Sequence, residues 1–246
     1  MSDIAAIYTD GPHYDRLFGS GHVGFWLSQA EANNGPILEL GCGTGKLSIP
    51  LAKAGFSVTG LDNSPALLRF AAGADNNVRW VEGDMRDFDL EDRFALVMLP
   101  SNNLCHLLTV DDFQRCMRSV KRHLLPGGAL VIDVFVPDLN LLLQDAKEEH
   151  LLSEYEDPSG RGRVRVMARS HYERATQIRR TTTVRRIAGQ PDQIGALDLK
   201  MYFPRELEGL VRLSGFAISD RYGGHSGEPL NDESRFQVLV CRHSNH

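Results

Sequence analysis

The stretch that decides the fold is Ile37-Leu38-Glu39-Leu40-Gly41-Cys42-Gly43-Thr44-Gly45. Its apolar first half predicts a short strand, and three glycines spaced two residues apart let the backbone turn sharply and approach a ligand closely. The residues that follow predict a helix over 44–54, ended by Gly55. A helix that begins after such a loop offers free backbone N–H groups and the positive end of its dipole to a ligand.

An acidic residue follows the next predicted strand. That strand covers residues 56–61, and Asp62 lies 21 residues after Gly41. A carboxylate in this place can accept hydrogen bonds from both hydroxyls of a ribose. Because the carboxyl ends of parallel strands meet at one edge of a sheet, the loop and the carboxylate together predict a nucleoside site there.

Two other nucleotide-binding motifs fail at specific positions of the loop. The dinucleotide fingerprint G-x-G-x-x-G needs glycine at position 46, where Lys46 stands. A phosphate-binding P-loop needs glycine at 40 and serine or threonine at 47, and the chain has Leu40 and Leu47. The sequence therefore disfavours both.

Strands and helices alternate through the first half of the chain, which favours a parallel sheet built from right-handed crossovers. The best-marked helix opens with Thr109-x-x-Asp112, which resembles a capping box, and Pro126-Gly127-Gly128 ends it. A later helix over 204–213 precedes two strands with no helix between them, so we expect these strands to be antiparallel neighbours. The predicted strands cover 37–40, 56–61, 78–82, 94–99, 129–136, 216–222 and 235–242, and a further helix covers 65–72.

Residues 139–205 interrupt this alternation. Between residues 161 and 186 the chain has nine arginines and one acidic residue, Glu173, a net charge of +8. Arg163 and Arg165 alternate with Val164 and Val166, which is the period of a strand, and residues 174–186 also favour a strand. We expect an antiparallel insertion here, lying over the ends of the main sheet.

Composition narrows the class of protein. The 246 residues include 42% hydrophobic and 24% charged residues with a net charge of −5, which favours a globular protein and disfavours nucleic acid as the main partner. No apolar run is long enough to span a membrane, and no signal peptide is visible. The cysteines have spacings that suit neither a metal site nor a disulfide framework, which favours the reducing cytoplasm; they are Cys42, Cys105, Cys116 and Cys241.

The chain resembles the class I S-adenosylmethionine-dependent methyltransferases, of the type that acts on small molecules. Residues 39–45 are similar to the first motif of that family almost letter for letter, and four further motifs follow in the expected order. They are Val58–Ser64, Gly83–Arg86, Phe94–Leu104 and Leu124–Gly128. The resemblance implies an α/β fold: a Rossmann-like, doubly wound, seven-stranded sheet whose last strand is antiparallel, with an antiparallel β insertion after the fifth strand.

The resemblance also implies roles for individual residues around S-adenosyl-L-methionine. Gly41 and Gly43 would line its methionine part, Asp62 would hold the ribose and Asp84 the adenine amino group. Asn63 and Met85 would flank the adenine, and Leu99 and Pro100 would lie near the sulfonium. The cofactor-binding residues expected in this way are Tyr8, Glu39, Gly41, Cys42, Gly43, Asp62, Asn63, Asp84, Met85, Leu99 and Pro100. Cys42 is expected to pack in the loop and not to act as a nucleophile, and no metal is expected.

Methyl transfer mainly needs a nucleophile held in line behind the methyl group, and an oxygen or protonated amine also needs a base. His106 follows the fourth strand, where related enzymes often carry a histidine; the alternative is a histidine packed under the next helix. Tyr14, together with Tyr8, resembles the N-terminal tyrosines that close over the cofactor; the alternative is an apolar anchor. His225 is a weaker candidate, since a histidine in a glycine-rich loop is commonly solvated.

These expectations divide the chain into four parts: an N-terminal helical lid segment (1–35), a cofactor-binding core (36–138), an acceptor-binding insertion (139–205) and the last part of the core (206–246). The expected reaction methylates nitrogen or oxygen of an amine, sugar or natural-product scaffold, with nitrogen slightly favoured. The alternatives are a nucleic-acid methyltransferase, a nucleotide-binding oxidoreductase and a non-catalytic relative. The insertion arginines have two interpretations: a solvated outer face, or an anion site formed by Arg169, Arg179 or Arg180. Monomer and homodimer both stay open.

Overall fold

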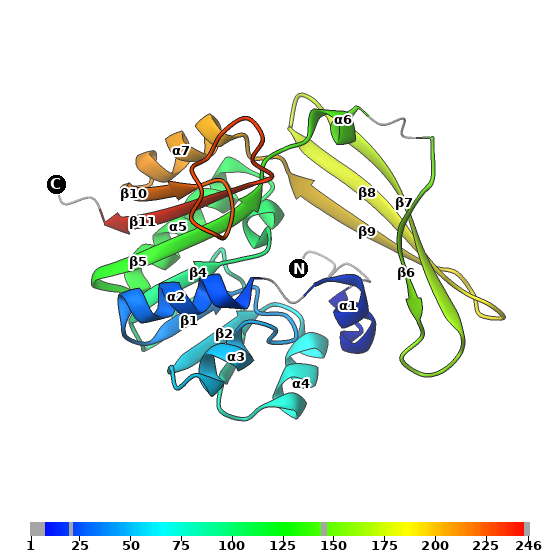
Figure 1. The fold of residues 1–246 in the computed structure, drawn as a ribbon, viewed down its shortest axis with the longest axis horizontal. Helices are drawn as coiled ribbons and strands as arrows, with labels where there is room; N and C mark the ends of the chain where they lie inside the picture. The colour runs from blue at the N-terminus through cyan, green and yellow to red at the C-terminus, as the bar shows by residue number, and fades with distance from the viewer. Residues whose placement is uncertain (1–7, 20–21, 144–146, 244–246) are drawn as a thin grey trace.

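The computed structural model describes residues 8–19, 22–143 and 147–243, and these form two β-sheets (Figure 1). The main sheet has the strand order β10-β11-β5-β4-β1-β2-β3, and β11 runs antiparallel to both of its neighbours while the other pairs are parallel. Its strands are β1 (Ile37–Leu40), β2 (Val58–Asp62), β3 (Arg79–Glu82), β4 (Phe94–Leu99), β5 (Leu124–Phe135), β10 (Phe216–Tyr222) and β11 (Phe236–His243). The predicted α/β fold class is confirmed.

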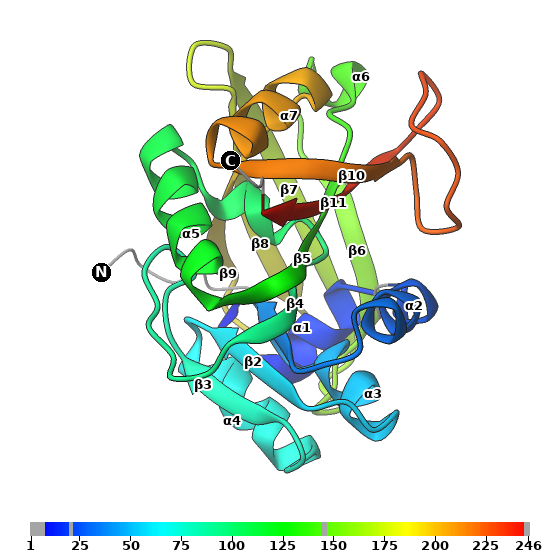
Figure 2. The ribbon, with the colours of Figure 1, turned by 90° about the vertical axis from the view of Figure 1, so that its left-hand side faces the viewer.

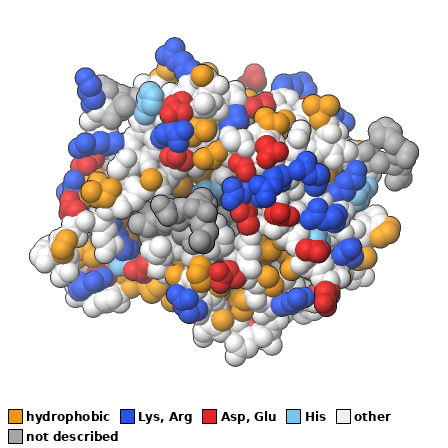
Figure 3. Space-filling view, turned by 180° about the vertical axis from the view of Figure 1, so that it is seen from behind, with side chains coloured by type: hydrophobic (Ala, Val, Ile, Leu, Met, Phe, Trp, Pro, Cys, Tyr) orange, Lys and Arg blue, Asp and Glu red, His pale blue; other side chains and the backbone are white. Residues whose placement is uncertain are grey.

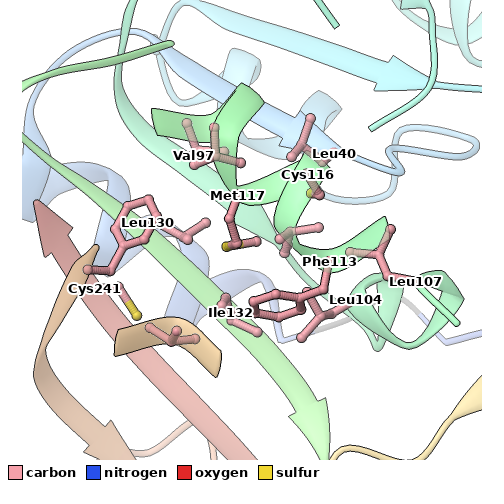
Figure 4. Packing of buried hydrophobic residues seen from close by; sticks show 14 of the residues in the cluster. Leu40, Val97, Leu104, Leu107, Phe113, Cys116, Met117, Leu130, Ile132 and Cys241 are labelled. Atoms are coloured by element: carbon pink, nitrogen blue, oxygen red, sulfur yellow. The ribbon is translucent and has the colours of Figure 1, made fainter. Parts of the chain in front are cut away.

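Helices cover both faces of the main sheet because its central strands are apolar on both sides. On one face, α2 (Val23–Asn33) and α3 (Ser48–Lys53) pack against alternate strand residues such as Leu96 and Met98. On the other face, α5 (Val110–His123) and α7 (Pro204–Leu213) pack against the strand residues that alternate with these, such as Val97. Figure 4 shows this second layer, in which Phe113 and Met117 of α5 lie against Leu130 and Ile132 of β5. A further helix, α4 (Pro65–Ala74), lies beside β2 and β3, and no helix within the described ranges is long and apolar enough to cross a membrane.

Three predicted boundaries are wrong by four or more residues, each for a local reason. The helix expected over 44–54 begins only at Ser48, since the backbone at Gly45 has a φ of +81° that no right-handed helix accommodates. β5 begins at Leu124, before the expected 129, and its register shifts by several residues where Pro126 and the two glycines bulge out. Residues 174–177, expected in a strand, form the turn before β8, with Gln177 at a φ of +56°.

The insertion is a four-stranded antiparallel sheet, which we call the lid sheet. Its strands are β6 (His150–Glu156), β7 (Arg163–Glu173), β8 (Ile178–Ile187) and β9 (Gln193–Lys200). The chain leaves β5 through the short helix α6 (Leu139–Leu142) and returns from β9 directly into α7. Figures 1 and 2 show the lid sheet beyond the end of the main sheet at which β1, β4 and β5 finish. This is the antiparallel insertion that the sequence predicts.

Apolar side chains lie on the inner face of the lid sheet and charged ones on its outer face, in the alternation that the strand period of the sequence predicts. Val164 and Val166 are buried on the inner face, whereas Arg163 and Arg165 between them are exposed and pair with Glu154. Charges of both signs also lie side by side on the back of the molecule, where a band of lysine and arginine runs beside carboxylates (Figure 3). Mixed charge of this kind differs from the one-sign patch typical of a nucleic-acid surface.

Helix α1 (Gly11–Leu17) lies between the glycine loop and the lid sheet. On the lid side, the His13 ring nitrogen Nδ1 lies 3.0 Å from the Tyr155 hydroxyl. On the loop side, Thr44 Oγ1 donates to Asp15 Oδ1 at 2.6 Å. Lys46 Nζ donates to the carbonyl oxygens of Asp15 (3.1 Å) and Phe18 and forms an ion pair with the Asp15 carboxylate at 3.4 Å. Lys46 therefore caps the C-terminal end of α1, where the helix dipole favours a cation.

This cap leads to a prediction about the motion of α1. Lys46→Met removes the cation and its hydrogen bonds to the helix end, so the amides of Tyr14 and Phe18 should exchange with deuterium at least about fivefold faster. Lys53→Met, an exposed lysine at the end of α3, is the matched control. Equal exchange in the two variants would show that Lys46 does not hold α1.

Candidate functional site

The glycine loop is fastened to the end of β2 by one carboxylate. Gly41, Gly43 and Gly45 have φ values of +75°, +55° and +81°, a region that glycine adopts at little cost. The Gly43 N–H donates to Asp62 Oδ2 at 2.8 Å, and the Ser64 N–H donates to Asp62 Oδ1 at 2.8 Å. The sequence predicted that loop and carboxylate lie together, and the structure brings them into direct contact.

Asp62 keeps acceptor capacity for a ligand. Burial raises the pKa of Asp62. Hydrogen bonds from the backbone N–H groups of Ser64, Gly43 and Asn63 lower it, but the effect of burial is larger and the net shift is upward. An ionised carboxylate offers about four acceptor positions, so at least one remains beyond these three hydrogen bonds and can accept from a ligand hydroxyl.

Two neighbouring cavities, one of them lined by Asp62, share five lining residues, and together we call them the cleft. The larger has a volume of about 360 Å³, and the smaller, of about 90 Å³, lies along the glycine loop. The residues that both share are Tyr8, Tyr14, Gly41, Asn103 and His106. Ala196, Leu197 and Asp198 of β9 line the larger cavity, so the lid sheet forms one of its walls.

Most of the expected site residues line this cleft. Asp62, Asn63, Asp84 and Met85 line the larger cavity only, and Glu39, Cys42 and Pro100 line the smaller one only. Gly43 contributes through its bond to Asp62. Leu99 differs: it lines neither cavity and is fully buried in the core. As the last residue of β4, Leu99 points toward α5, because side chains alternate along a strand.

Glu39 is a buried acid at the wall of the smaller cavity. Its Oε2 accepts a hydrogen bond from Ser48 Oγ at the start of α3. Burial raises the pKa of Glu39 to about 8, although the Ser48 hydrogen bond lowers it. The side chain is therefore largely protonated at neutral pH in this state of the protein. A cation in the smaller cavity would favour its ionised form.

Asp84 is engaged by a residue that the sequence analysis did not single out. Arg86 Nε lies 2.9 Å from both Asp84 carboxylate oxygens, and Arg86 Nη1 donates to Asp112 Oδ1 at 3.3 Å. Burial raises the pKa of Asp84, but the hydrogen bonds and charge of Arg86 outweigh it, and the net shift is downward. Asp84 is therefore held ionised, with its carboxylate fixed at the rim of the larger cavity.

His106 lies where the two cavities meet. It is on the 3₁₀ helix η2 (Asn103–His106), and its Nε2 lies 3.1 Å from the Tyr8 hydroxyl. Burial lowers the pKa of His106 to about 4, so the ring is neutral at physiological pH. Burial also raises the pKa values of Tyr8 and Tyr14 well above those of ordinary phenols. The cleft therefore holds one imidazole and two phenols, all uncharged.

His225 lies outside the cleft. Its Nε2 lies 3.1 Å from Asp133 Oδ2, and its ring stacks on His22 with 3.6 Å between centroids. Asp133 Oδ2 also accepts from the Ser101 N–H at 3.2 Å, and Ser101 and Asn102 have φ values of +54° and +68°. The pair of His225 and Asp133 therefore stabilises the turn after β4.

Three contributors to the cleft were missed. Asn103 Nδ2 donates to the carbonyl oxygens of Leu40 (2.8 Å) and Gly41 (2.9 Å), and a Cβ at position 41 would lie 2.6 Å from that amide. Lys46 and Arg86 are the others. Lys46 stands where a dinucleotide-binding loop needs glycine, and Arg86 and Asn103 stand inside the motifs Gly83–Arg86 and Phe94–Leu104, although no role was assigned to them. The contacts of Asn103 and of Arg86 with Asp112 join segments far apart in the sequence.

Comparisons with known proteins agree with this geometry. Residues 37–128 match the model of a methyltransferase domain family. The chain is 28% identical to cypemycin N-terminal methyltransferase from Streptomyces sp over 90% of its length and 89% of that protein. It is 35% identical to dTDP-4-amino-2,3,4,6-tetradeoxy-D-glucose N,N-dimethyltransferase from Saccharopolyspora spinosa, over 39% of each chain.

The fold is similar to that of the CcbJ methyltransferase from Streptomyces caelestis, with a TM-score of 0.83, 26% identity, and coverage of 97% of this chain and 98% of that one. Other structures of this fold were solved with S-adenosylmethionine bound. The cleft suits that molecule, since Gly41 lines both cavities and Asp62 keeps acceptor capacity on the larger one. Together, the family-model match, the relatives and the solved structures support a class I S-adenosylmethionine-dependent methyltransferase.

Proposed function

We propose that this enzyme transfers a methyl group from S-adenosylmethionine to a nitrogen of a small-molecule acceptor. The observation that carries this proposal is the neutral His106, placed with Tyr8 where the two cavities of the cleft meet. The names of two relatives also indicate N-methylation, of a peptide N-terminus in one and of an amino sugar in the other. Support for small-molecule acceptors comes from these relatives.

We assign the smaller cavity to the methionine part of the cofactor and the larger one to its adenosine part. Glu39 and the backbone of Gly41 would face the methionine end, where a charged amino group would draw Glu39 into its ionised form. Asp62 would accept from the ribose hydroxyls, and Asp84, Asn63 and Met85 would surround the adenine. Pro100 would lie near the sulfonium, whereas the buried Leu99 would act only through packing.

The bound cofactor supplies a methyl group that its sulfonium already activates. The chain's own residues position the acceptor nitrogen in line behind that methyl, and such positioning can lower the barrier by roughly 7–11 kcal/mol. In this proposal His106, neutral at working pH, accepts the proton that the nitrogen loses as the new C–N bond forms. Because burial lowers its pKa, the ring accepts that proton less readily than an ordinary imidazole does. Tyr8 fixes the orientation of the His106 ring through its hydroxyl. Tyr14 of α1 and Leu197 of the lid sheet line the larger cavity and would limit the access of water to it.

We also propose a cytoplasmic location. The four cysteines are free and buried. Unpaired thiols of this kind suit a reducing compartment.

The first prediction concerns binding of the product S-adenosylhomocysteine. Asp62→Ala removes both the ribose acceptor and the brace of the glycine loop, so affinity measured by calorimetry should fall at least about 100-fold. Asp232→Ala, at an exposed loop aspartate, should leave the affinity unchanged. Undiminished binding by a folded Asp62→Ala protein would contradict the assignment of the cleft.

The second prediction tests the acceptor and the base together. The enzyme should methylate a dTDP-amino sugar or a peptide with a free N-terminus, detected by mass spectrometry. His106→Gln should lower kcat at least about 100-fold while leaving S-adenosylhomocysteine affinity within about threefold, because a general base typically contributes 10²–10⁴-fold to the rate. Equal kcat values for wild type and variant would exclude His106 as the base.

The third prediction concerns pH and stability. Because burial lowers the pKa of His106 to about 4, the unfolded chain binds a proton there between about pH 6.5 and pH 4 that the native chain does not. Acidification through this window should therefore lower the free energy of unfolding. Between pH 6 and pH 5, His106→Gln should lose about 1 kcal/mol less stability than wild type in urea denaturation. Parallel losses would mean that His106 titrates normally.

A further inference from the structure

One arginine of the lid sheet differs from the others. Seven of the nine between residues 161 and 186 have a carboxylate partner within the described part of the chain. Arg174 is exposed in the turn before β8. Arg179 is half-buried, and among the described residues it has no ion-pair partner; its Nε is buried without a hydrogen bond.

Arg179 lies on the inner face of the lid sheet. It shares this face with Thr181 and Thr183 of β8, which are buried. Its direct neighbours across the strands are Tyr172 on β7 and Leu199 on β9. Leu199 packs against the main core, and Leu197, on the same face two residues earlier, lines the larger cavity. A residue diagonally across from Leu197 is within about 8 Å of it, so Arg179 flanks the wall of the cleft.

The carboxylates near this position are already engaged. Glu206 Oε1 accepts from Lys200 Nζ at 2.9 Å. Asp198 and Glu173 both pair with Arg180, on the outer face, at 2.5 and 2.6 Å. Among the described residues the guanidinium of Arg179 thus lacks a protein anion, although the next residue, Arg180, has two.

A half-buried cation without a partner is unfavourable, since it loses hydration and gains no ion pair. Burial accordingly lowers the pKa of Arg179. A guanidinium in this setting is suited to an incoming anion, because its planar fork of N–H donors matches the two oxygens of a carboxylate or phosphate.

We propose that Arg179 is the anion-binding residue of the acceptor site, and that the acceptor carries a phosphate or carboxylate besides the nitrogen that is methylated. This inference rests on the proposed function. It resolves the two interpretations of the insertion arginines: Arg169 and Arg180 pair with Glu149 and with Glu173 and Asp198, and Arg179 remains for a ligand.

The test uses two probes, inorganic pyrophosphate and succinate, titrated by calorimetry into the full-length protein saturated with S-adenosylhomocysteine. Wild type should bind at least one of them, and which one identifies the anion. Arg179→Gln should weaken that binding at least tenfold. Arg179→Lys keeps the charge but not the planar fork of donors, so its anion affinity should lie between those of wild type and Arg179→Gln. Arg174→Gln, the other arginine without a carboxylate partner within the described ranges, should stay within twofold of wild type.

The remaining outcomes separate the ideas. Absence of anion binding by wild type, or equal binding by Arg179→Gln, overturns the anion site while the cofactor assignment stands. A lowered Tm in Arg179→Gln with unchanged anion affinity would mean that Arg179 stabilises the lid sheet, and this result also overturns the anion site. An unchanged or raised Tm of Arg179→Gln together with lost anion binding supports the anion site. Failure of wild type to bind S-adenosylhomocysteine would instead remove the proposed function.

Discussion

The carboxylate of Asp62 is the constraint on which the site depends. One of its oxygens holds the glycine loop at Gly43, and the other holds the start of α4 at Ser64. These bonds join the ends of β1 and β2, so the loop has a defined shape before any ligand arrives. Ser64 Oγ in turn donates to the Tyr8 carbonyl at 2.6 Å, which extends the same network to the N-terminal segment. Tyr8, His106 and the larger cavity are placed relative to this one side chain.

The cleft is uncharged around His106, whereas the larger cavity is also lined by Asp62, Asp84, Asp112 and Asp198. His106, Tyr8 and Tyr14 are neutral, and Glu39 is largely protonated at neutral pH. Asp84 has its charge balanced by Arg86. The negative charge that a sulfonium or ammonium group meets is therefore concentrated at few positions and can rise when Glu39 ionises. Burial also keeps the His106 ring neutral, because it lowers the pKa of the ring.

Local pattern made much of the fold predictable. The apolar strands β1 and β4 and the helix α5, with its Thr109 cap and the stripe of Phe113 and Met117, follow from period and capping alone. The cleft residues Asp62 and Asp84 could be named because parallel strands bring their ends to one edge. Contacts between distant segments could not be predicted: Asn103 on the glycine loop, Lys46 on the end of α1, and the unpaired state of Arg179. Leu99 was misplaced because motif position does not reveal which way a strand's last side chain points.

The lid sheet enters from β5 and leaves into α7, so it is one continuous piece of chain inserted between two elements of the main sheet. The family match ends at residue 128, before that piece begins. A chain built in this way can exchange or remodel the insertion during evolution without disturbing the Asp62 network. In our proposal the acceptor contacts the lid sheet, so the resemblance within residues 37–128 reports on the methyl donor site and not on the choice of acceptor.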